Sequence, residues 1–390
     1  MHWRYRHTAL ALCTLAFFAT MVARLAISPV VPAITADFGV SNGAVGLALT
    51  GMWAAYALSQ FPSGVFGDRF GERRVIVAAV GLTALASTAL ALSPGFAAFA
   101  LLAVLLGSGA GFHYSVATTF LAKQFGNVGR AIGVHVAGGP LAGLVVPVVA
   151  AAVGARYGWR PALLLGTLVA LPTVGLVAWH VRPTVPARPD QPVAERFALG
   201  PLVEVLSRPS IAYTAALAIG GAFTWQATAS FLPAFLAAHH GLSTTTAGAL
   251  FSLYFLVHGS TGPLTGWLSD RYGRDRTVAL TMGTGVLGYG LLVAGGGLET
   301  VVPAVAMIGL AMSWGAPVQS RFIDHLSTTE RGAGFGLVRT VYMGLGALGS
   351  VVVGTFADGP GWPAAFGLLV GVMALGFVAV AGNRAFSLGL

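Results

Sequence analysis

The chain has 390 residues, of which 56% are hydrophobic and only 8% are charged, whereas soluble domains carry about 25% charged residues. This composition excludes a soluble globule and indicates a multi-pass membrane protein, because 21 basic and 12 acidic side chains cannot cover the surface of so large a domain. Long, continuous apolar runs exclude a transmembrane β-barrel, and the single cysteine, Cys13, excludes an internal disulfide and a cysteine-built metal site.

Twelve apolar segments are each long enough to cross a bilayer, which takes about 20 residues. In chain order they cover residues 8–35, 42–66, 75–93, 96–122, 131–153, 160–181, 210–237, 244–267, 277–296, 300–322, 333–356 and 363–382. The first is too long for a signal peptide and is followed by more spans, so we expect it to be retained as helix 1.

The basic residues are distributed unevenly among the connections. With the N-terminus in the cytoplasm, 17 of the 21 Lys and Arg residues fall on the cytoplasmic side and only Arg156 and Arg160 fall outside. This bias predicts twelve spans in the cytoplasmic membrane with both termini in the cytoplasm. The proline-rich, polar segment 182–209 is predicted to be a cytoplasmic linker between two six-helix halves, residues 1–181 and 210–390.

The two halves repeat each other. Gly64-Val-Phe-Gly-Asp68-Arg69-Phe-Gly71-Glu-Arg73-Arg74 ends predicted helix 2, and Gly266-Trp-Leu-Ser-Asp270-Arg271-Tyr-Gly273-Arg-Asp-Arg276 ends predicted helix 8, 202 residues later. So long a period within one hydropathy pattern indicates duplicated helix bundles and excludes a solenoid.

The first of these loops resembles the signature loop of the major facilitator superfamily, and the second resembles its weaker copy. The resemblance extends over almost the whole chain, since motif, repeat, number of spans and linker position agree. It implies an all-α membrane fold of twelve transmembrane helices in two pseudo-symmetric six-helix bundles, and a transporter without a cofactor.

The charged loop residues are predicted to form a conformational latch on the cytoplasmic side. A carboxylate is stabilised beside a helix N-terminus, so we expect Asp68 to lie near the start of helix 11 and Asp270 near the start of helix 5. The alternative is that the arginines only set the topology. Glycines in these loops are expected to permit tight turns and close approach. The latch candidates are Gly64, Asp68, Arg69, Gly71, Arg73, Arg74, Arg130, Gly266, Asp270, Arg271, Gly273, Arg276 and Arg331.

Two positions depart from patterns found in the superfamily. Predicted helix 4 has Ala103 where an arginine is frequent, four residues before Gly107. Predicted helix 5 carries Gly138-Gly139-Pro140, which partly resembles a motif of drug:proton antiporters, but has His135 where that motif has glycine. The alternative for the Gly/Pro run is a kinked, closely packed helix.

Only two basic residues, Arg24 in helix 1 and Arg339 in helix 11, fall inside predicted spans away from the span ends, whereas all twelve acidic residues fall at span ends or in loops. An arginine at mid-bilayer costs about 2.5–3.5 kcal/mol unless it faces a wet cavity or a partner. Guanidinium binds carboxylate or phosphate in a bidentate manner and stays charged. Two arginines inside the spans, without acidic residues beside them, therefore predict an anionic substrate.

Arg24 is followed eight residues later by Pro32, and this resembles helix 1 of the organophosphate antiporters and organic-anion symporters, where such an arginine contacts the anionic group of the substrate. The matching position in helix 7 is Trp225, so a two-arginine clamp from helices 1 and 7 is absent, and Arg339 is the candidate second cation. The alternative for both arginines is that they snorkel or bond helix carbonyls.

Histidine is the residue here that can change protonation near neutral pH inside a membrane, so His113, His135 and His258 are candidates for proton coupling, with a structural role as the alternative. The further substrate-binding candidates, with packing as their alternative, are His113, His258, Trp225, Gln226, Tyr254, Tyr56, Gln60, Trp314 and Gln319.

Three functions are compared. The first is a secondary active transporter for a small anion, a monomer in the lipid bilayer that works by alternating access as a symporter or antiporter, with protons as the candidate coupling ion. The second is a proton-coupled multidrug exporter, which the missing intramembrane carboxylate disfavours. The third is a membrane enzyme or receptor, for which the sequence offers no H-E-x-x-H, G-x-S-x-G or P-loop motif. A nucleic-acid partner is not predicted.

Overall fold

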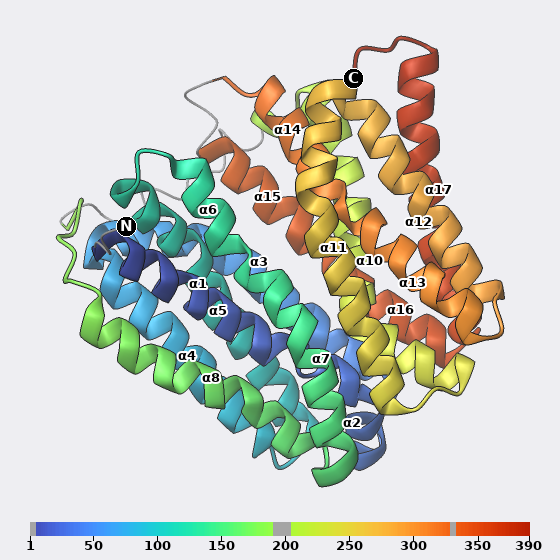
Figure 1. Cartoon of the computed structure of the whole chain (residues 1–390), viewed down its shortest axis with the longest axis horizontal. Helices are drawn as coiled ribbons and strands as arrows, with labels where there is room; N and C mark the ends of the chain where they lie inside the picture. The colour runs from blue at the N-terminus through green and yellow to red at the C-terminus, as the bar shows by residue number, and fades with distance from the viewer. Residues whose placement is uncertain (1–4, 190–203, 328–332) are drawn as a thin grey trace. The chain divides into compact units, whose positions relative to one another are not determined.

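The computed structural model describes residues 5–189, 204–327 and 333–390, and all the regular elements defined in these ranges are helices (Figure 1). They form two packed units. The first unit comprises Met1–Gly39 and Gly51–Phe197, and the second comprises Val40–Thr50 and Ala198–Leu390. Helix α3 is therefore divided, because its first residues pack within the second unit.

The first unit follows the predicted segments in order, and two of them are broken helices. Its elements are α1 (Tyr5–Leu25), η1 (Ser28–Val30), α2 (Val31–Phe38), α3 (Asn42–Phe70), α4 (Glu72–Ala91), α5 (Phe96–Gln124), α6 (Val128–Val136), α7 (Gly138–Tyr157) and α8 (Trp159–His180). Pro29 is the second residue of η1, and the α-helix does not continue through it because proline lacks the N–H that a continuing helix needs. Helix α7 restarts at Gly138 after a break at Ala137.

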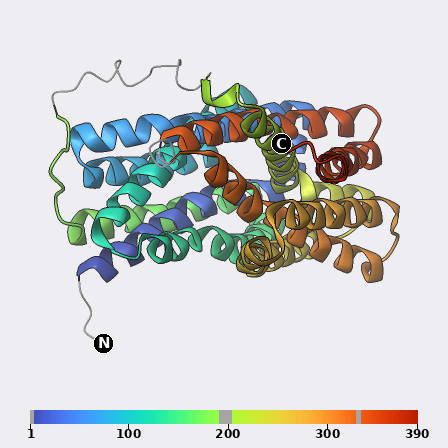
Figure 2. The same cartoon turned by 90° about the horizontal axis from the view of Figure 1, so that it is seen from above.

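The second unit repeats this plan. Its elements are α10 (Pro209–His240), α11 (Thr244–Tyr272), α12 (Arg274–Ala294), α13 (Leu298–Ala311), η3 (Met312–Trp314), α14 (Gly315–His325), α15 (Ala333–Gly346), α16 (Leu348–Asp358) and α17 (Trp362–Ala385). In the first unit α4 packs against α5 and α8, and in the second unit α12 packs in the same way against α13 and α17 (Figures 1 and 2).

The signature motif lies at a helix corner. We expected spans to end at residues 66 and 267, but α3 continues to Phe70 and α11 to Tyr272, so both motif aspartates lie in a last helical turn. Charged residues are tolerated there because a helix can continue beyond its apolar stretch. Each corner is a single glycine with positive φ, +86° at Gly71 and +99° at Gly273, a conformation in which glycine alone is unstrained.

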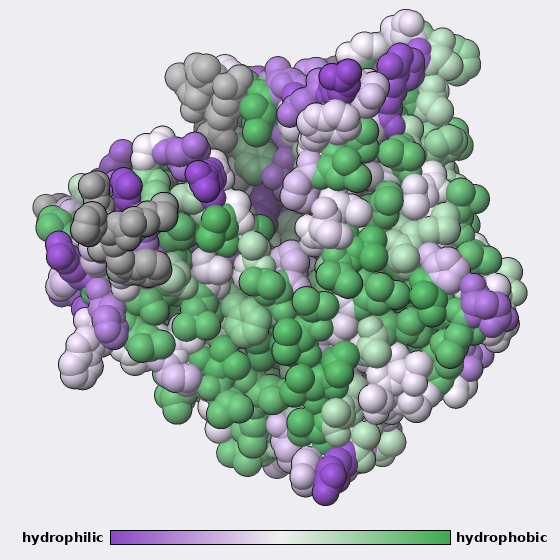
Figure 3. Space-filling model, viewed as in Figure 1, coloured by the Kyte–Doolittle hydropathy of each residue, from purple (hydrophilic) through white to green (hydrophobic). Residues whose placement is uncertain are grey.

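Nine helical segments in the described part of the chain are long and apolar enough to span a bilayer. Helices α3, α10 and α11 are at least as long, with 29, 32 and 29 residues, but glycine and polar side chains dilute their hydropathy. Apolar side chains cover the middle of the face seen in Figure 3, and hydrophilic ones gather toward its margins. The prediction of an all-helical, multi-pass membrane protein is confirmed, and the count of twelve spans stays a prediction.

Close helix packing positions the residues of the candidate site. A Cβ atom added at Gly107 or Gly111 of α5 would lie 2.0 Å from the carbonyl oxygen of Met52 or 2.3 Å from that of Tyr56. The two glycines are four residues apart and share one face, so they allow α5 to press against α3. In the second unit a Cβ atom at Gly349 would lie 2.2 Å from the carbonyl oxygen of Phe223, which brings α16 against α10.

Candidate substrate site

Arg24 is buried inside the first unit, in the last turn of α1, with 2% of its surface exposed. Its Nε donates to the carbonyl oxygen of Thr20 at 3.1 Å, and its Nη2 donates to Sδ of Met21 at 2.9 Å. Both acceptors belong to the preceding turn of the same helix. They hold one edge of the guanidinium group and leave the Nη1 amino group beyond their reach.

Two aromatic rings from α3 cover the Arg24 charge. Its Cζ atom lies 4.1 Å from the ring centroid of Tyr56 and 5.1 Å from that of Trp53, and both rings are buried. Rings at this distance attract a cation through their quadrupole. None of the ion pairs between described residues involves Arg24. The buried guanidinium is thus stabilised by aromatic faces and helix acceptors instead of by a carboxylate.

His113 of α5 and His135 of α6 form a buried pair in the same unit. Their ring centroids are 5.6 Å apart, and Phe17 of α1 lies 5.3 Å from the His135 ring. None of the four ring nitrogens has a hydrogen-bond partner among the described residues, although His135 faces the backbone of Cys13. His113 is also within electrostatic range of Arg24. Two predicted proton-coupling residues therefore lie together beside the predicted anion ligand.

The remaining candidate of the first unit, Gln60, follows Tyr56 by one helical turn. It is 6% exposed, and its Nε2 donates to the Tyr56 carbonyl oxygen at 3.4 Å. The structure thus brings Arg24, Tyr56, His113 and His135 together and places Gln60 one turn away.

In the second unit, Gln226 and Trp314 carry buried polar atoms without partners. Gln226 Nε2 donates to the carbonyl oxygen of Met343 at 3.0 Å, while its Oε1 has no hydrogen-bond partner among the described residues. The Nε1 atom of Trp314 also lacks one, and this ring lies 6.3 Å from the ring of Tyr342. Polar groups left unpaired in a packed interior cost free energy unless water or a ligand binds them.

A second group in the same unit comes from α11. Tyr254 is fully buried, its hydroxyl has no partner among described groups, and its ring stacks at 6.1 Å from that of the half-buried His258. Arg339 is half-buried one turn before Tyr342, Trp225 is half-buried on α10, and Gln319 is exposed on α14.

The predicted latch residues of the first unit contact the segment that follows α8. The backbone N–H of Arg73 donates to Oγ1 of Thr184 at 3.1 Å, and its guanidinium donates to the carbonyl oxygen of Ala178. A Cβ atom at Gly71 would lie 2.6 Å from the Thr184 carbonyl oxygen. The carbonyl oxygen of Asp68 accepts from the N–H of Arg188 at 2.9 Å. The start of the predicted linker is therefore packed onto the motif, which its polar composition did not indicate.

Some expectations for the latch glycines and arginines are corrected or stay untested. A Cβ atom at Gly64 would meet nothing within 4 Å and one at Gly266 would meet one atom at 4.0 Å, so neither glycine is needed for close approach. Arg130 is exposed at the start of α6, and Arg331 lies outside the described residues. Arg69, Arg74, Arg271 and Arg276 are exposed.

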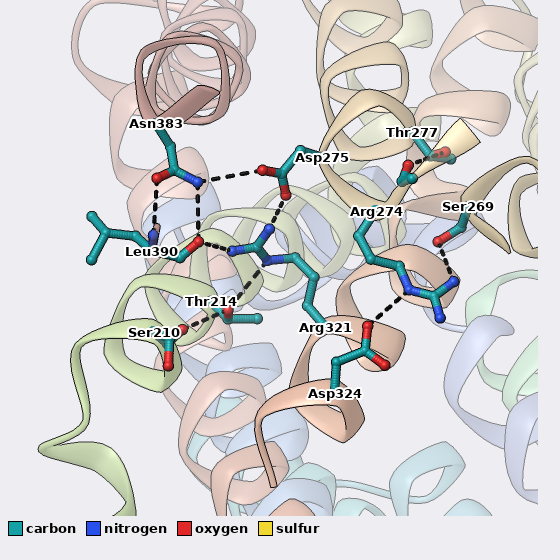
Figure 4. A network of polar contacts seen from close by, with 11 residues as sticks. Ser210, Thr214, Ser269, Arg274, Asp275, Thr277, Arg321, Asp324, Asn383 and Leu390 are labelled. Atoms are coloured by element: carbon teal, nitrogen blue, oxygen red, sulfur yellow. Dashed lines mark hydrogen bonds and ion pairs between the residues drawn. The ribbon is translucent and has the colours of Figure 1, made fainter. Parts of the chain in front are cut away.

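In the second unit Arg274 stabilises the motif through ion pairs (Figure 4). This residue pairs with Asp270 and with Asp324, whose Oδ2 is 3.0 Å from Nε of Arg274. A neighbouring network surrounds Arg321, whose buried guanidinium pairs with Asp275 and donates to the main-chain oxygen of Leu390 at 2.6 Å. In the sequence Arg321 is only one of the 17 basic residues on the predicted cytoplasmic side, because its partners lie on other helices.

The two units carry the same ion pair with opposite polarity. In the first unit Glu72, at the start of α4, pairs with Lys123 near the end of α5. The positions about 202 residues later are Arg274 at the start of α12 and Asp324 near the end of α14, and they pair as well. The repeat has therefore preserved the contact while exchanging the charges.

Asp358 forms a cap on the first residues of α3, within the second unit. Its carboxylate accepts from the backbone N–H groups of Asn42 at 3.0 Å and Gly43 at 2.7 Å, and from Nδ2 of Asn42 at 2.8 Å. Farther along, Oγ1 of Thr50 donates to the carbonyl oxygen of Ala347 at 2.9 Å. We call these contacts the α3–α16 clasp. A carboxylate at a helix N-terminus is favoured by the helix dipole.

A repeated, all-helical membrane protein with a buried arginine has the architecture of a solute transporter. The family model described as Major Facilitator Superfamily matches residues 13–235 and 214–384, so the chain belongs to this superfamily and is a transporter, not an enzyme.

Two distant relatives match most of the chain. The "Hexuronate transporter" of Bacillus subtilis (strain 168) is 23% identical over 90% of this chain and 88% of its own length. The "Gallate transporter" of Pseudomonas putida is 25% identical over 83% and 78%, respectively. The crystal structure of a mutant of the nucleoside transporter NupG has a TM-score of 0.79 and 14% identity, covering 96% of this chain and 99% of that one, and so shares its fold.

Proposed function

We propose that the protein is a secondary active transporter that moves a small organic anion, a carboxylate in the first instance, across the cytoplasmic membrane by alternating access. The observation that carries this proposal is the buried Arg24 guanidinium, which pairs with no described carboxylate. Two relatives that match most of the chain are named as transporters of hexuronate and gallate, which are both carboxylates.

The chemistry of the Arg24 environment supports an anionic ligand. A buried charge is costly unless it is paired, and aromatic contacts contribute about 0.5–2 kcal/mol toward that cost. Because Thr20 and Met21 occupy one edge of the guanidinium, a carboxylate approaches through the Nη1 side, where charge-assisted hydrogen bonds are strong. Arg339, Trp225, Gln226, Tyr254, His258, Trp314 and Gln319 are the proposed contacts from the second unit, with Tyr56, Gln60 and His113 from the first.

His113 and His135 are the proposed carriers of a coupling proton. Their ring nitrogens have no described hydrogen-bond partners, and imidazole is the side chain that exchanges protons near neutral pH. A proton on this pair would add positive charge near Arg24 and favour anion binding. Transport of an anion together with a proton is therefore the proposed coupling.

Alternating access requires contacts that form and break at both sides of the membrane. We assign both termini and the linker 182–209 to the cytoplasm, with six spans on each side of that linker and a monomer as the working unit. Helix α3 then has a carboxylate near each end. Asp358 caps its first residues in the α3–α16 clasp, and Asp68 in its last turn is the proposed cytoplasmic latch. The clasp breaks whenever residues 42–50 leave α16.

The test is uptake of radiolabelled glucuronate and gallate into proteoliposomes, with and without an inward proton gradient. We expect saturable uptake of at least one anion. We expect the Arg24→Gln variant to have an about 10- to 100-fold lower kcat/KM, which corresponds to the free energy of one hydrogen bond to a charged group. An Arg156→Gln variant, which removes an exposed arginine, is the matched control. Full anion transport by the Arg24→Gln variant would refute the proposal, and proton-driven export of a lipophilic cation instead would favour a multidrug exporter.

A further inference from the structure

An apolar groove of about 400 Å³ lies on the first unit where α3, α4 and α5 meet. It is lined by the rings of Phe66, Phe70 and Phe112 and by the small side chains of Ala78 and Ala79 of α4. The rings of Phe66 and Phe112 stack with centroids 5.6 Å apart. The groove is therefore a trough between aromatic side chains on membrane-spanning helices.

One end of this groove is positively charged. Arg74 lines it from the first turn of α4, next to the boundary of the predicted span 75–93. Arg74, Ala78 and Leu82 are four residues apart and lie on one face of α4, so the groove runs about 12 Å along the helix from this arginine. The guanidinium of Arg69 adds a second cation nearby, 5.5 Å from the ring of Phe70.

Arg74 differs from its neighbours in having no protein partner among the described residues. Glu72 pairs with Lys123, and Arg73 donates to Ala178, whereas Arg74 is exposed and forms no ion pair or hydrogen bond in this part of the chain. A positive charge near the end of the helix is enough to set the topology. The topology therefore does not explain why Arg74 lies at the end of an apolar groove. An apolar groove that ends at an unpaired cation fits an amphiphile that has an apolar tail and an anionic head.

We propose that this groove binds an anionic phospholipid, with one acyl chain along α4 and the phosphate group at Arg74. Apolar tail and anionic head are both required, because inorganic phosphate cannot fill the trough and a lipid without net charge gains less from the two arginines. Basic pockets between membrane helices near the cytoplasmic surface are favourable sites for acidic lipid head groups. The site is independent of the transported solute.

The internal repeat supplies a control substitution for each feature of the site. Arg276, 202 residues after Arg74, is exposed at the same place on α12. The counterpart of Ala78 is Leu280, a larger side chain that is 51% exposed. An Ala78→Leu variant therefore gives the first unit the side chain of the second, and an Arg276→Gln variant removes an equivalent charge away from the groove.

The experiment is native mass spectrometry of the detergent-purified protein with phosphatidylglycerol or phosphatidylcholine, with inorganic phosphate as a separate arm. We expect phosphatidylglycerol to bind more tightly than phosphatidylcholine, with about fivefold weaker binding in the Arg74→Gln variant. The Ala78→Leu variant should lose the bound lipid, and the Arg276→Gln variant should bind as the parent does. Unfolding midpoints without lipid identify any variant that is misfolded.

Three results would overturn the proposal. The first is unchanged phosphatidylglycerol binding in both the Arg74→Gln and Ala78→Leu variants, and the second is equal binding of the two lipids. The third is competition by inorganic phosphate at millimolar concentration, which would indicate an anion site without an acyl chain. Should the Ala78→Leu variant misfold, the exposed Arg74→Gln variant decides the matter.

Discussion

Arg24 illustrates how a single charge is kept inside a membrane helix. The cost of about 2.5–3.5 kcal/mol for a mid-bilayer arginine is offset here by the Thr20 carbonyl, the Met21 sulfur and two aromatic rings. These contacts leave the charge in place without neutralising it. The anionic substrate that we propose would supply the neutralising charge.

Tyr56 is predicted to stabilise Arg24 through its ring and through its hydroxyl group, which interacts with the guanidinium. A Tyr56→Leu variant loses both contacts and should weaken anion affinity by about 2- to 30-fold, which corresponds to the free energy of a cation–π contact, whereas a Tyr56→Phe variant keeps the ring and should weaken it less. Anion affinity measured by isothermal titration on the purified protein distinguishes the two. Equal loss in both variants would show that the hydroxyl group is the important part.

The ion pair of Glu72 and Lys123 connects two helices and is asymmetric in burial. The side chain of Glu72 is 4% exposed and that of Lys123 is 49% exposed. Removal of the lysine therefore leaves a buried carboxylate without its partner, whereas removal of the carboxylate leaves a lysine that can reach water. The pair holds the start of α4 to the end of α5.

We predict from this asymmetry that Lys123→Met destabilises the protein by about 2–3 kcal/mol and Glu72→Gln by less than about 1 kcal/mol. Unfolding by denaturant in detergent, followed by tryptophan fluorescence, measures both values. A Glu72→Lys, Lys123→Glu double variant reproduces the polarity found in the second unit and should recover part of the loss. Equal effects of the two single substitutions would contradict this account.

The α3–α16 clasp gives a second prediction for whole elements. Asp358→Asn keeps the shape of the side chain but removes the charge at the start of α3, so we expect a loss of about 1 kcal/mol in the free energy of unfolding. Glu299→Gln removes an exposed carboxylate from the first turn of another helix, α13, so it measures how much the helix dipole alone contributes. If the clasp does not contribute to stability, Asp358→Asn will cause no larger loss than Glu299→Gln.

At the scale of the whole molecule, the predicted topology assigns each connection to one side of the membrane. Gly126, between α5 and α6, is expected in the cytoplasm, and Gly296, between α12 and α13, outside. A Cβ atom at either position would meet nothing within 4 Å, so cysteines can be placed there in a Cys13→Ala background. In intact cells a membrane-impermeant maleimide should label the Gly296→Cys variant and should label the Gly126→Cys variant only after permeabilisation. The reverse pattern would invert the topology.

The sequence alone was sufficient for the membrane class, the helical fold, the internal repeat and the superfamily, because hydropathy, charge and repetition can be read along one dimension. It also identified Arg24 as a candidate site residue, because a charged residue within an apolar segment can be recognised without knowledge of the fold. The positions of the helix breaks near Pro29 and Gly138 follow from local backbone chemistry in the same way.

The tertiary structure alone decided which side chains meet. The pairing of His113 with His135, the placement of Tyr56 and Trp53 on Arg24, and the exchanged charges of the two ion pairs all join different helices. The groove ending at Arg74 and the cap of Asp358 on α3 have the same origin. Such contacts depend on how helices rotate and slide against one another, which small residues such as Gly107 and Gly111 determine through packing in three dimensions.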